Sequence, residues 1–187
     1  TPWSENATIL EMVSHFRSCF LDLNISGPIE LAGFSFGGLL AYELARQLKA
    51  DGTVIQNLVL VDSDVPKPKF GLRDNILYLP FFVRNLRYWL QTHQPLIRPS
   101  VFIPRALRKV RELRARMSKD KNGTRRLPFD AGVDLQNLPE HYIKRMQIAF
   151  QARQGYAPGN FEGKVSLIRA QSLPLFYRYV PGMGWNT

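Results

Sequence analysis

The chain has 187 residues, of which 45% are hydrophobic, and its formal net charge is +10 at pH 7. This length supports one domain with a buried core. Cys19 is the only cysteine, which excludes an internal disulfide and favours a reducing, cytoplasmic compartment. No apolar run is long enough to span a membrane, and no signal-peptide pattern opens the chain. The composition therefore agrees with a cytoplasmic α/β protein.

The first predicted element is an amphipathic helix over residues 9–17. Ser4 is its predicted N-cap, because serine side chains accept hydrogen bonds from the free amides of a first helical turn. We expect His15 to lie on the helix surface or to pack against a neighbour. Cys19 is expected to be packed rather than reactive.

The most informative stretch is Gly33-Phe34-Ser35-Phe36-Gly37. It follows a short apolar run at 28–32, typical of a strand, and precedes strong helix formers at 39–48. A serine at a strand-to-helix turn forms a nucleophile elbow, in which a strained backbone projects the hydroxyl away from the sheet. The alternative is an ordinary glycine-rich turn.

The glycines and the helix start give this elbow its predicted chemistry. Gly33 and Gly37 leave room for the strand and helix to approach closely, and Gly38 adds a third position without a side chain. The helix directs its free N–H groups at any negative charge that develops on a reacting carbonyl. The amide of Phe36 is therefore a candidate oxyanion donor beside the candidate nucleophile Ser35.

A second polar residue follows the next predicted strand. Residues 57–62 form an apolar, β-branched run that ends in Asp62, typical of a buried parallel strand. Because catalytic groups collect at the carboxyl ends of such strands, we expect Ser35 and Asp62 at the same edge of one sheet. The alternative for Asp62 is a carboxylate that caps the following turn. Asp64 is expected to be solvated.

The basic excess is concentrated in one insertion. Between Lys67 and Arg126 there are sixteen Lys/Arg residues against three Asp/Glu, whereas the rest of the chain has nine against twelve. Helices are predicted over 74–93, with a break at Pro80, over 104–117, and from Pro139 to about Arg153. In the third helix, Ile143, Met146 and Phe150 are expected to face the protein interior.

The basic helix at 104–117 has several interpretations. It is a solvated face or a docking surface for an acidic protein. Nucleic acid binding is disfavoured because no recognised readout fold is present, and membrane binding because the apolar stripe has few aromatic residues.

Residues 32–38, together with 40–45, closely resemble the thioesterase domains that end nonribosomal peptide synthetases and polyketide synthases. Residues 156–158 and 161–170 resemble the same family's return from its lid to a core strand. The resemblance implies a partial α/β-hydrolase fold: a mostly parallel sheet with flanking helices and a helical lid insertion at 67–155. Asp62 matches the family's placement of its catalytic aspartate. The resemblance is weakest between 67 and 137.

The resemblance also leads us to expect that residues 1–187 are a domain truncated at both ends. Core strands are predicted near 29–34, 57–62 and 164–170, fewer than a complete hydrolase sheet contains. The three histidines, His15, His93 and His141, all precede the last of these strands, so the catalytic histidine is expected beyond Gly184-Trp185. The loop that supplies the second oxyanion donor is expected upstream of Thr1. The chain alone is therefore expected to show little turnover.

The implied activity is release of an acyl or peptidyl chain from a carrier protein, by hydrolysis or cyclisation. Ser35 attacks the thioester, the Phe36 amide helps hold the oxyanion, and Asp62 orients the absent histidine. No metal or bound cofactor is expected, because the phosphopantetheine arm belongs to the carrier protein, which is the expected partner. Candidates for lining the acyl channel, with core packing as the alternative for each, are Phe81, Phe82, Trp89, Phe150 and Tyr156.

Two other functions stay open. The first is a catalytically incomplete chain that serves only in protein contacts. The second is a general carboxylesterase or lipase, which the position of Asp62 disfavours.

Overall fold

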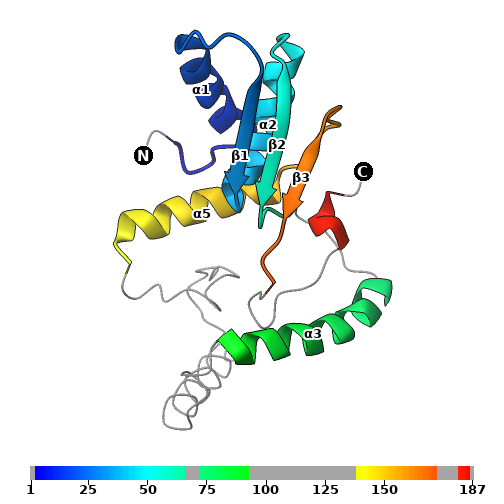
Figure 1. Cartoon of the computed structure of the whole chain (residues 1–187). Helices are drawn as coiled ribbons and strands as arrows, with labels where there is room; N and C mark the ends of the chain where they lie inside the picture. Colours follow the sequence, from blue (N-terminus) through cyan, green and yellow to red (C-terminus); the bar gives the residue numbers. More distant parts are fainter. Residues whose placement is uncertain (1–2, 66–71, 93–137, 172–180, 186–187) are drawn as a thin grey trace. The chain divides into compact units, whose positions relative to one another are not determined.

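The computed structural model describes residues 3–65, 72–92, 138–171 and 181–185 (Figure 1). The chain divides into two compact units. The first comprises Thr1–Leu77, Asn137–Ala170 and Arg178–Thr187, and the second comprises Tyr78–Gln136 and Gln171–Tyr177. The described elements, in chain order, are α1 (Ile9–Asp22), β1 (Ile29–Phe34), α2 (Phe36–Ala50), β2 (Ile55–Val61), α3 (Leu72–Thr92), α5 (Glu140–Gln154), β3 (Val165–Ile168) and the 3-10 turn η4 (Pro181–Gly184).

The sheet of the first unit is parallel, with strand order β1-β2-β3. Phe34 at the end of β1 pairs with Val61 at the end of β2, which in turn pairs with Ile168 at the end of β3. The three arrowheads in Figure 1 therefore point to one edge. The three predicted strands are confirmed to within two residues at each end, and Leu58 and Leu60 of β2 are fully buried, as its apolar run predicted.

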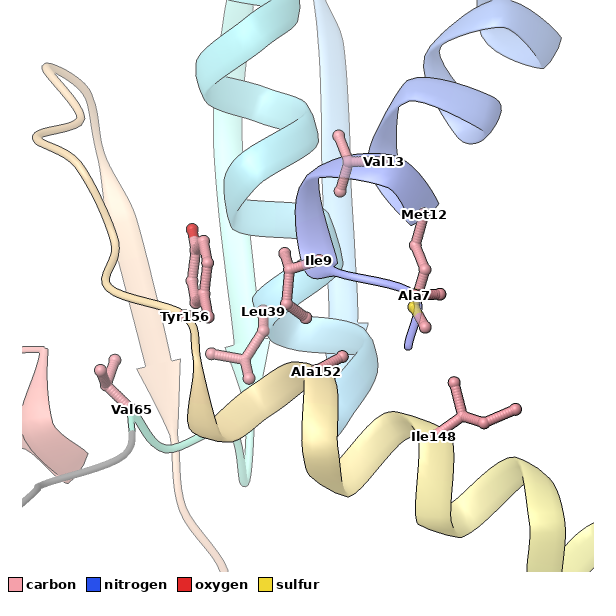
Figure 2. Packing of buried hydrophobic residues seen from close by; sticks show 9 residues of the cluster. All are labelled: Ala7, Ile9, Met12, Val13, Leu39, Val65, Ile148, Ala152 and Tyr156. Atoms are coloured by element: carbon pink, nitrogen blue, oxygen red, sulfur yellow. The ribbon is translucent and has the colours of Figure 1, made fainter. Parts of the chain in front are cut away.

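Helix α2 lies between α1 and the sheet. It contacts α1 on one side and strands β1 and β2 on the other. A helix covered on two sides must be apolar on two sides, and two clusters of buried residues share it. The first cluster joins α2 to α1 and α5, as Figure 2 shows, through Ala7, Ile9, Met12, Val13, Leu39, Val65, Ile148, Ala152 and Tyr156. The second joins α2 to the sheet through Ala41, Tyr42, Ala45, Leu58 and Leu60.

Helix α1 begins at Ile9, where the amphipathic pattern predicted, but its N-cap is Thr8 and not Ser4. The Thr8 amide donates to Glu11 Oε2 at 2.7 Å, and the Glu11 amide donates to Thr8 Oγ1 at 3.2 Å. This reciprocal capping box satisfies two amides at once, which the isolated Ser4 hydroxyl cannot do.

Cys19 is exposed, contrary to the prediction that it would be packed. The buried residues of α1, Ile9, Met12 and Val13, all lie in its first half. In the second half even Phe16 is exposed, so the apolar stripe continues beyond the part that α2 covers. Cys19 lies in that uncovered half.

Helix α5 confirms the predicted helix after Pro139, but its buried residues are Ile148 and Ala152. The predicted inward residues Ile143, Met146 and Phe150 are only partly buried. Ile148 and Ala152 lie one turn apart and face the first cluster, beside α1 and α2 (Figure 2).

Helix α3 runs without interruption through Pro80, where a break was predicted. Proline removes one intrahelical hydrogen bond, yet the helix continues, with Pro80 itself exposed and Phe81 and Asn85 buried on one face. Within the described residues of the 67–155 span there are helices and no strand. The predicted helix at 104–117 and His93 lie outside the described residues. In the described ranges, no helix is both long and apolar enough to cross a bilayer.

Candidate active site at the carboxyl edge of the sheet

Ser35 connects β1 directly to α2, and its backbone is strained. Its φ is 51° and its ψ is −122°, a conformation that residues with a Cβ rarely adopt. The Ser35 amide donates to the carbonyl of Val61 on β2 at 2.8 Å, which holds the turn against the neighbouring strand. The Ser35 side chain is exposed and makes no capping hydrogen bond to its own helix. This is the geometry of a nucleophile elbow.

The space that the elbow requires falls on Gly33 and Gly38. A Cβ at Gly33 would overlap the carbonyl of Gly37, and a Cβ at Gly38 would overlap the side chain of Ser63. A Cβ at Gly37 would meet no atom within 4 Å. The sequence indicated Gly33 and Gly37 as the pair that lets strand and helix approach. In the structure a Cβ would be excluded at Gly33 and Gly38, and not at Gly37.

The first turn of α2 presents amide donors beside Ser35. The Gly38 amide already donates to the Ser35 carbonyl at 3.0 Å. Phe36 is the first residue of the helix, and the first amides of a helix have no acceptor within it. The Phe36 N–H is therefore in the position expected of an oxyanion donor.

Asp62 lies directly after β2, one position beyond the Phe34 and Val61 pair and beside Ser35 in register. This agrees with the predicted placement at one edge of one sheet. Its φ is 46°, so two neighbouring residues of this edge have left-handed backbones. The Asp62 amide donates to the carbonyl of Ile168 at 2.8 Å, and Asp62 Oδ1 accepts from the Ala170 amide at 2.6 Å. Asp62 therefore bonds across to the β3 end, rather than capping the turn that follows its own strand.

Asp64 is ion-paired, contrary to the prediction that it would be solvated. Arg153 Nη2 on α5 lies 2.7 Å from Asp64 Oδ2, and both side chains are about one quarter exposed. The partner comes from a residue 89 positions later in the chain, which no local pattern indicates.

Sequence reasoning missed Ser63, which lies between these two aspartates. Ser63 is fully buried, and within the described residues its hydroxyl has no hydrogen-bond partner. Its carbonyl accepts a hydrogen bond from Trp185 Nε1 at 2.8 Å. A serine between two aspartates has no pattern that distinguishes it from a loop residue.

Glu43 on α2 was also missed. It is 1% exposed and accepts hydrogen bonds from Arg46 Nη2 at 2.7 Å, Gln47 Nε2 at 3.0 Å and Tyr156 Oη at 3.0 Å. Burial alone raises the pKa of Glu43, but these bonds, led by the one from Arg46, outweigh burial and lower the pKa below its ordinary value of 4.5. The Arg46 and Gln47 positions, three and four residues on, were a usable signal.

Tyr156 belongs to the first core cluster and also lines the cavity beside this network, so its role in an acyl channel stays a prediction. Burial, followed by the neighbouring Glu43 carboxylate, raises the pKa of Tyr156 above its ordinary value of 10.0. A cavity of about 770 Å³ lies beside this network, lined by α1, α2, α5 and residues 155–159. Phe81 is buried, Phe82 and Phe150 are partly buried, and the side chain of Trp89 is outside the described residues.

The two described histidines contact other parts of the first unit. The His15 ring packs edge-on against Trp3, with centroids 5.1 Å apart, and Cys19 Sγ lies 3.8 Å from His15 Nε2. His141 lies in the first turn of α5 against Tyr142. The contact with Trp3 agrees with the surface or packing role expected for His15.

Comparison with known proteins gives matches to megasynthase sequences. The non-reducing polyketide synthase hmp3 of Hypomyces subiculosus is 48% identical over 50 residues, 27% of this chain and 2% of that protein. The polyketide synthase PksR of Bacillus subtilis is 34% identical over 55 residues, 29% of this chain and 2% of that protein. N-(5-amino-5-carboxypentanoyl)-L-cysteinyl-D-valine synthase of Amycolatopsis lactamdurans is 44% identical over 61 residues, 33% and 1%. The chain thus spans a small fraction of these relatives.

Solved structures with similarity to the chain include two thioesterase domains. The NocB thioesterase domain, in covalent complex with a fluorophosphonate nocardicin G analog, has a TM-score of 0.46 at 24% identity, over 86% of this chain and 52% of that one. The SrfTE domain, which cyclises the lipopeptide surfactin, has a TM-score of 0.39 at 14% identity, over 89% and 66%.

The family model of the thioesterase domain matches residues 3–171 of the chain. That span contains the elbow, the residue after β2 and all three strands. With its parallel sheet and flanking helices, the chain belongs to the thioesterase domain family.

Proposed function

We propose that this domain releases an acyl or peptidyl chain from the phosphopantetheine arm of a carrier protein, through an acyl-enzyme on Ser35. The observation that carries the proposal is the strained, exposed Ser35 at the β1–α2 turn with Asp62 beside it in register. A hydroxyl that makes no capping bond to its own helix is placed to attack a carbonyl whose oxygen then faces the first amides of that helix.

The proposed reaction has two halves. Ser35 Oγ attacks the thioester carbonyl carbon while a histidine base takes the hydroxyl proton, and the Phe36 amide donates to the resulting oxyanion. The carbon–sulfur bond then breaks, and the phosphopantetheine thiol leaves with that proton. Water or an internal nucleophile next attacks the acyl ester, loses its proton through the same base, and regenerates the Ser35 hydroxyl.

Asp62 is proposed to orient that base. Its Oδ1 is held by the Ala170 amide, which leaves Oδ2 to accept from an imidazole N–H. We place the base at a histidine other than His15 and His141, whose rings pack on α1 and α5. No bound cofactor takes part in this reaction.

The carrier-bound substrate is inferred from the relatives, which are named as synthases, and from the family resemblance. The basic span at 67–126 is proposed to orient an acidic carrier protein. The single cysteine fits a reducing compartment, and we place the reaction in the cytoplasm.

Acyl loading of Ser35 tests the proposal. The full polypeptide that carries this domain is incubated with an acyl thioester on its carrier protein, and adducts are mapped by peptide mass spectrometry. We expect the acyl group on the peptide that contains Ser35, and we expect Ser35→Ala to abolish both the adduct and turnover. Ser18→Ala, on the exposed face of α1, is the matched serine control.

Three further outcomes separate the alternatives. An adduct elsewhere, or turnover that survives Ser35→Ala, contradicts the proposal. Faster cleavage of matched oxygen esters than of thioesters identifies an esterase or lipase, and carrier binding without acyl loading identifies a chain that serves only in contacts. Loss of turnover in His93→Ala would place the base at His93.

A further inference from the structure

The loop that carries Asp62 is fixed at every one of its residues. We call residues 62–65 the acid loop. Each has a partner from a later part of the chain: Ile168 and Ala170 for Asp62, Trp185 for Ser63, Arg153 for Asp64 and Met183 for Val65. A loop whose first residue has a left-handed backbone needs such support, because the surroundings must outweigh the strain.

Ser63 is the residue through which the acid loop contacts the elbow. It is fully buried, and its side chain lies so close to Gly38 that a methyl group there would overlap its Cβ and Oγ. Ser63 is bonded on one side to Asp62 and pressed on the other against the first turn of α2. A displacement of Ser63 therefore changes the separation between Asp62 and Ser35.

Trp185 is the described side chain that holds the backbone of Ser63. Its Nε1 donates to the Ser63 carbonyl at 2.8 Å, and an indole nitrogen can only donate, so the direction of this bond is fixed. The ring packs against both core clusters, and its centroid lies 4.5 Å from that of Tyr42. The donor is thus held in place by the core, and the Val65 amide, which donates to the Met183 carbonyl at 2.9 Å, holds the same segment.

We propose that Trp185 is a positioning residue for the active site: its indole N–H holds Ser63, and through Ser63 it sets the placement of Asp62 relative to the elbow. Trp185 touches no substrate in this role. The inference rests on the proposed function, which supplies the reaction that Asp62 serves.

The inference is tested by removing the indole N–H donor of Trp185 while keeping the shape of its ring. In the full polypeptide, Trp185 is replaced by 3-benzothienylalanine, which has the same fused ring shape with sulfur in place of N–H, and separately by phenylalanine. We expect kcat for thioester release to fall about threefold to tenfold, the range that a lost neutral hydrogen bond gives, with KM within about twofold. The exchange protection of the Ala170 amide, which bonds Asp62 Oδ1, is expected to fall about tenfold.

Tyr42→Phe is the matched control. It removes the bond from Tyr42 Oη to the Gly159 carbonyl at 2.8 Å, on the ring against which Trp185 packs, but leaves the acid loop untouched. We expect a loss of thermal stability like that of the Trp185 variants, with kcat and Ala170 protection unchanged.

Unchanged Ala170 protection in the benzothienyl variant, or reduced protection with wild-type kcat, overturns the inference. An equal fall of kcat in Tyr42→Phe also overturns it, since that would be a general loss of stability. If the Ser35→Ala variant turns over substrate at the wild-type rate, the proposed function is wrong. Hydrogen exchange of the Ala170 amide would still report, independently of turnover, whether Trp185 holds Asp62 in place.

Discussion

Positive φ values are concentrated at the sheet edge that carries the candidate site residues Ser35 and Asp62. In the described parts of the chain, four residues other than glycine have positive φ: Asn24, Ser35, Asp62 and Met183. Asparagine and aspartate tolerate this conformation better than serine and methionine do. Ser35, Asp62 and Met183 belong to the elbow, the acid loop and the segment that bonds it. Each costs on the order of 1 to 3 kcal/mol. The strain is therefore concentrated where the proposed chemistry takes place.

The contact between Gly38 and Ser63 predicts a sharp difference between two neighbouring glycines. We expect Gly38→Ala to lower the free energy of unfolding by about 1 to 3 kcal/mol, because a methyl group would overlap Ser63 in a packed site. Gly37→Ala meets open space in a helix and is expected to change it by less than about 1 kcal/mol, in the stabilising direction. Urea denaturation of both variants measures this.

The double variant Gly38→Ala/Ser63→Gly is the control for the mechanism. Removing the Ser63 side chain makes room for the new methyl group, so it should recover part of the stability that Gly38→Ala loses. Equal effects of Gly37→Ala and Gly38→Ala would contradict the packing described for the elbow.

At the scale of elements, the three strands and α2 could be predicted from local sequence. Apolar runs mark the strands, and a run of strong helix formers marks α2. Local sequence does not predict which side chains form hydrogen bonds with residues distant in the chain. Asp64 and Arg153, and Glu43 and Tyr156, meet across 89 and 113 residues. Thr8 replaced Ser4 as the N-cap because Glu11 completes its capping box, a signal that was present and overlooked.

The Glu43 network joins α2 to the chain after α5, and its ionisation predicts a pH-dependent contribution to stability. Because the folded pKa of Glu43 lies below 4.5, its stabilisation is complete above that value and is lost as pH falls through the folded pKa. We expect Glu43→Gln to lower the free energy of unfolding at pH 7 by about 1 to 3 kcal/mol.

That deficit should shrink as the pH falls below 4.5, because the wild-type carboxylate becomes protonated as well. Urea denaturation at pH 7, 4.5 and 3.5 measures it. Glu162→Gln, which replaces an exposed carboxylate outside this network, is the control for the substitution itself. A deficit that is the same at all three pH values would show that Glu43 acts only through its shape.

At the scale of the whole molecule, the charge is the dominant property. The chain carries +10, with its basic excess in one span of the sequence. Charge of one sign steers oppositely charged partners and is screened by salt within a Debye length of about 10 Å at 0.1 M. A small neutral substrate feels none of this.

Two substrates with the same acyl group should therefore respond differently to salt. Raising NaCl from 50 to 300 mM is expected to lower kcat/KM severalfold for the carrier-bound thioester, with kcat unchanged. The N-acetylcysteamine thioester should stay within about twofold. Equal salt dependence for the two substrates would show that the basic span does not steer the carrier protein.

The long-range bonds of Glu43, Tyr42 and Ser63 have a consequence for how this domain can diversify. They close the chain across separations of 113, 117 and 122 residues, so the ends of the intervening segment are fastened to α2 and the acid loop. The entropy of closing such a loop grows only logarithmically, by about 0.6 kcal/mol for each doubling of its length. The closure cost of the connection between the acid loop and α5 therefore changes little when that connection is lengthened or shortened. Such changes of length leave the sheet edge that carries Ser35 and Asp62 in place.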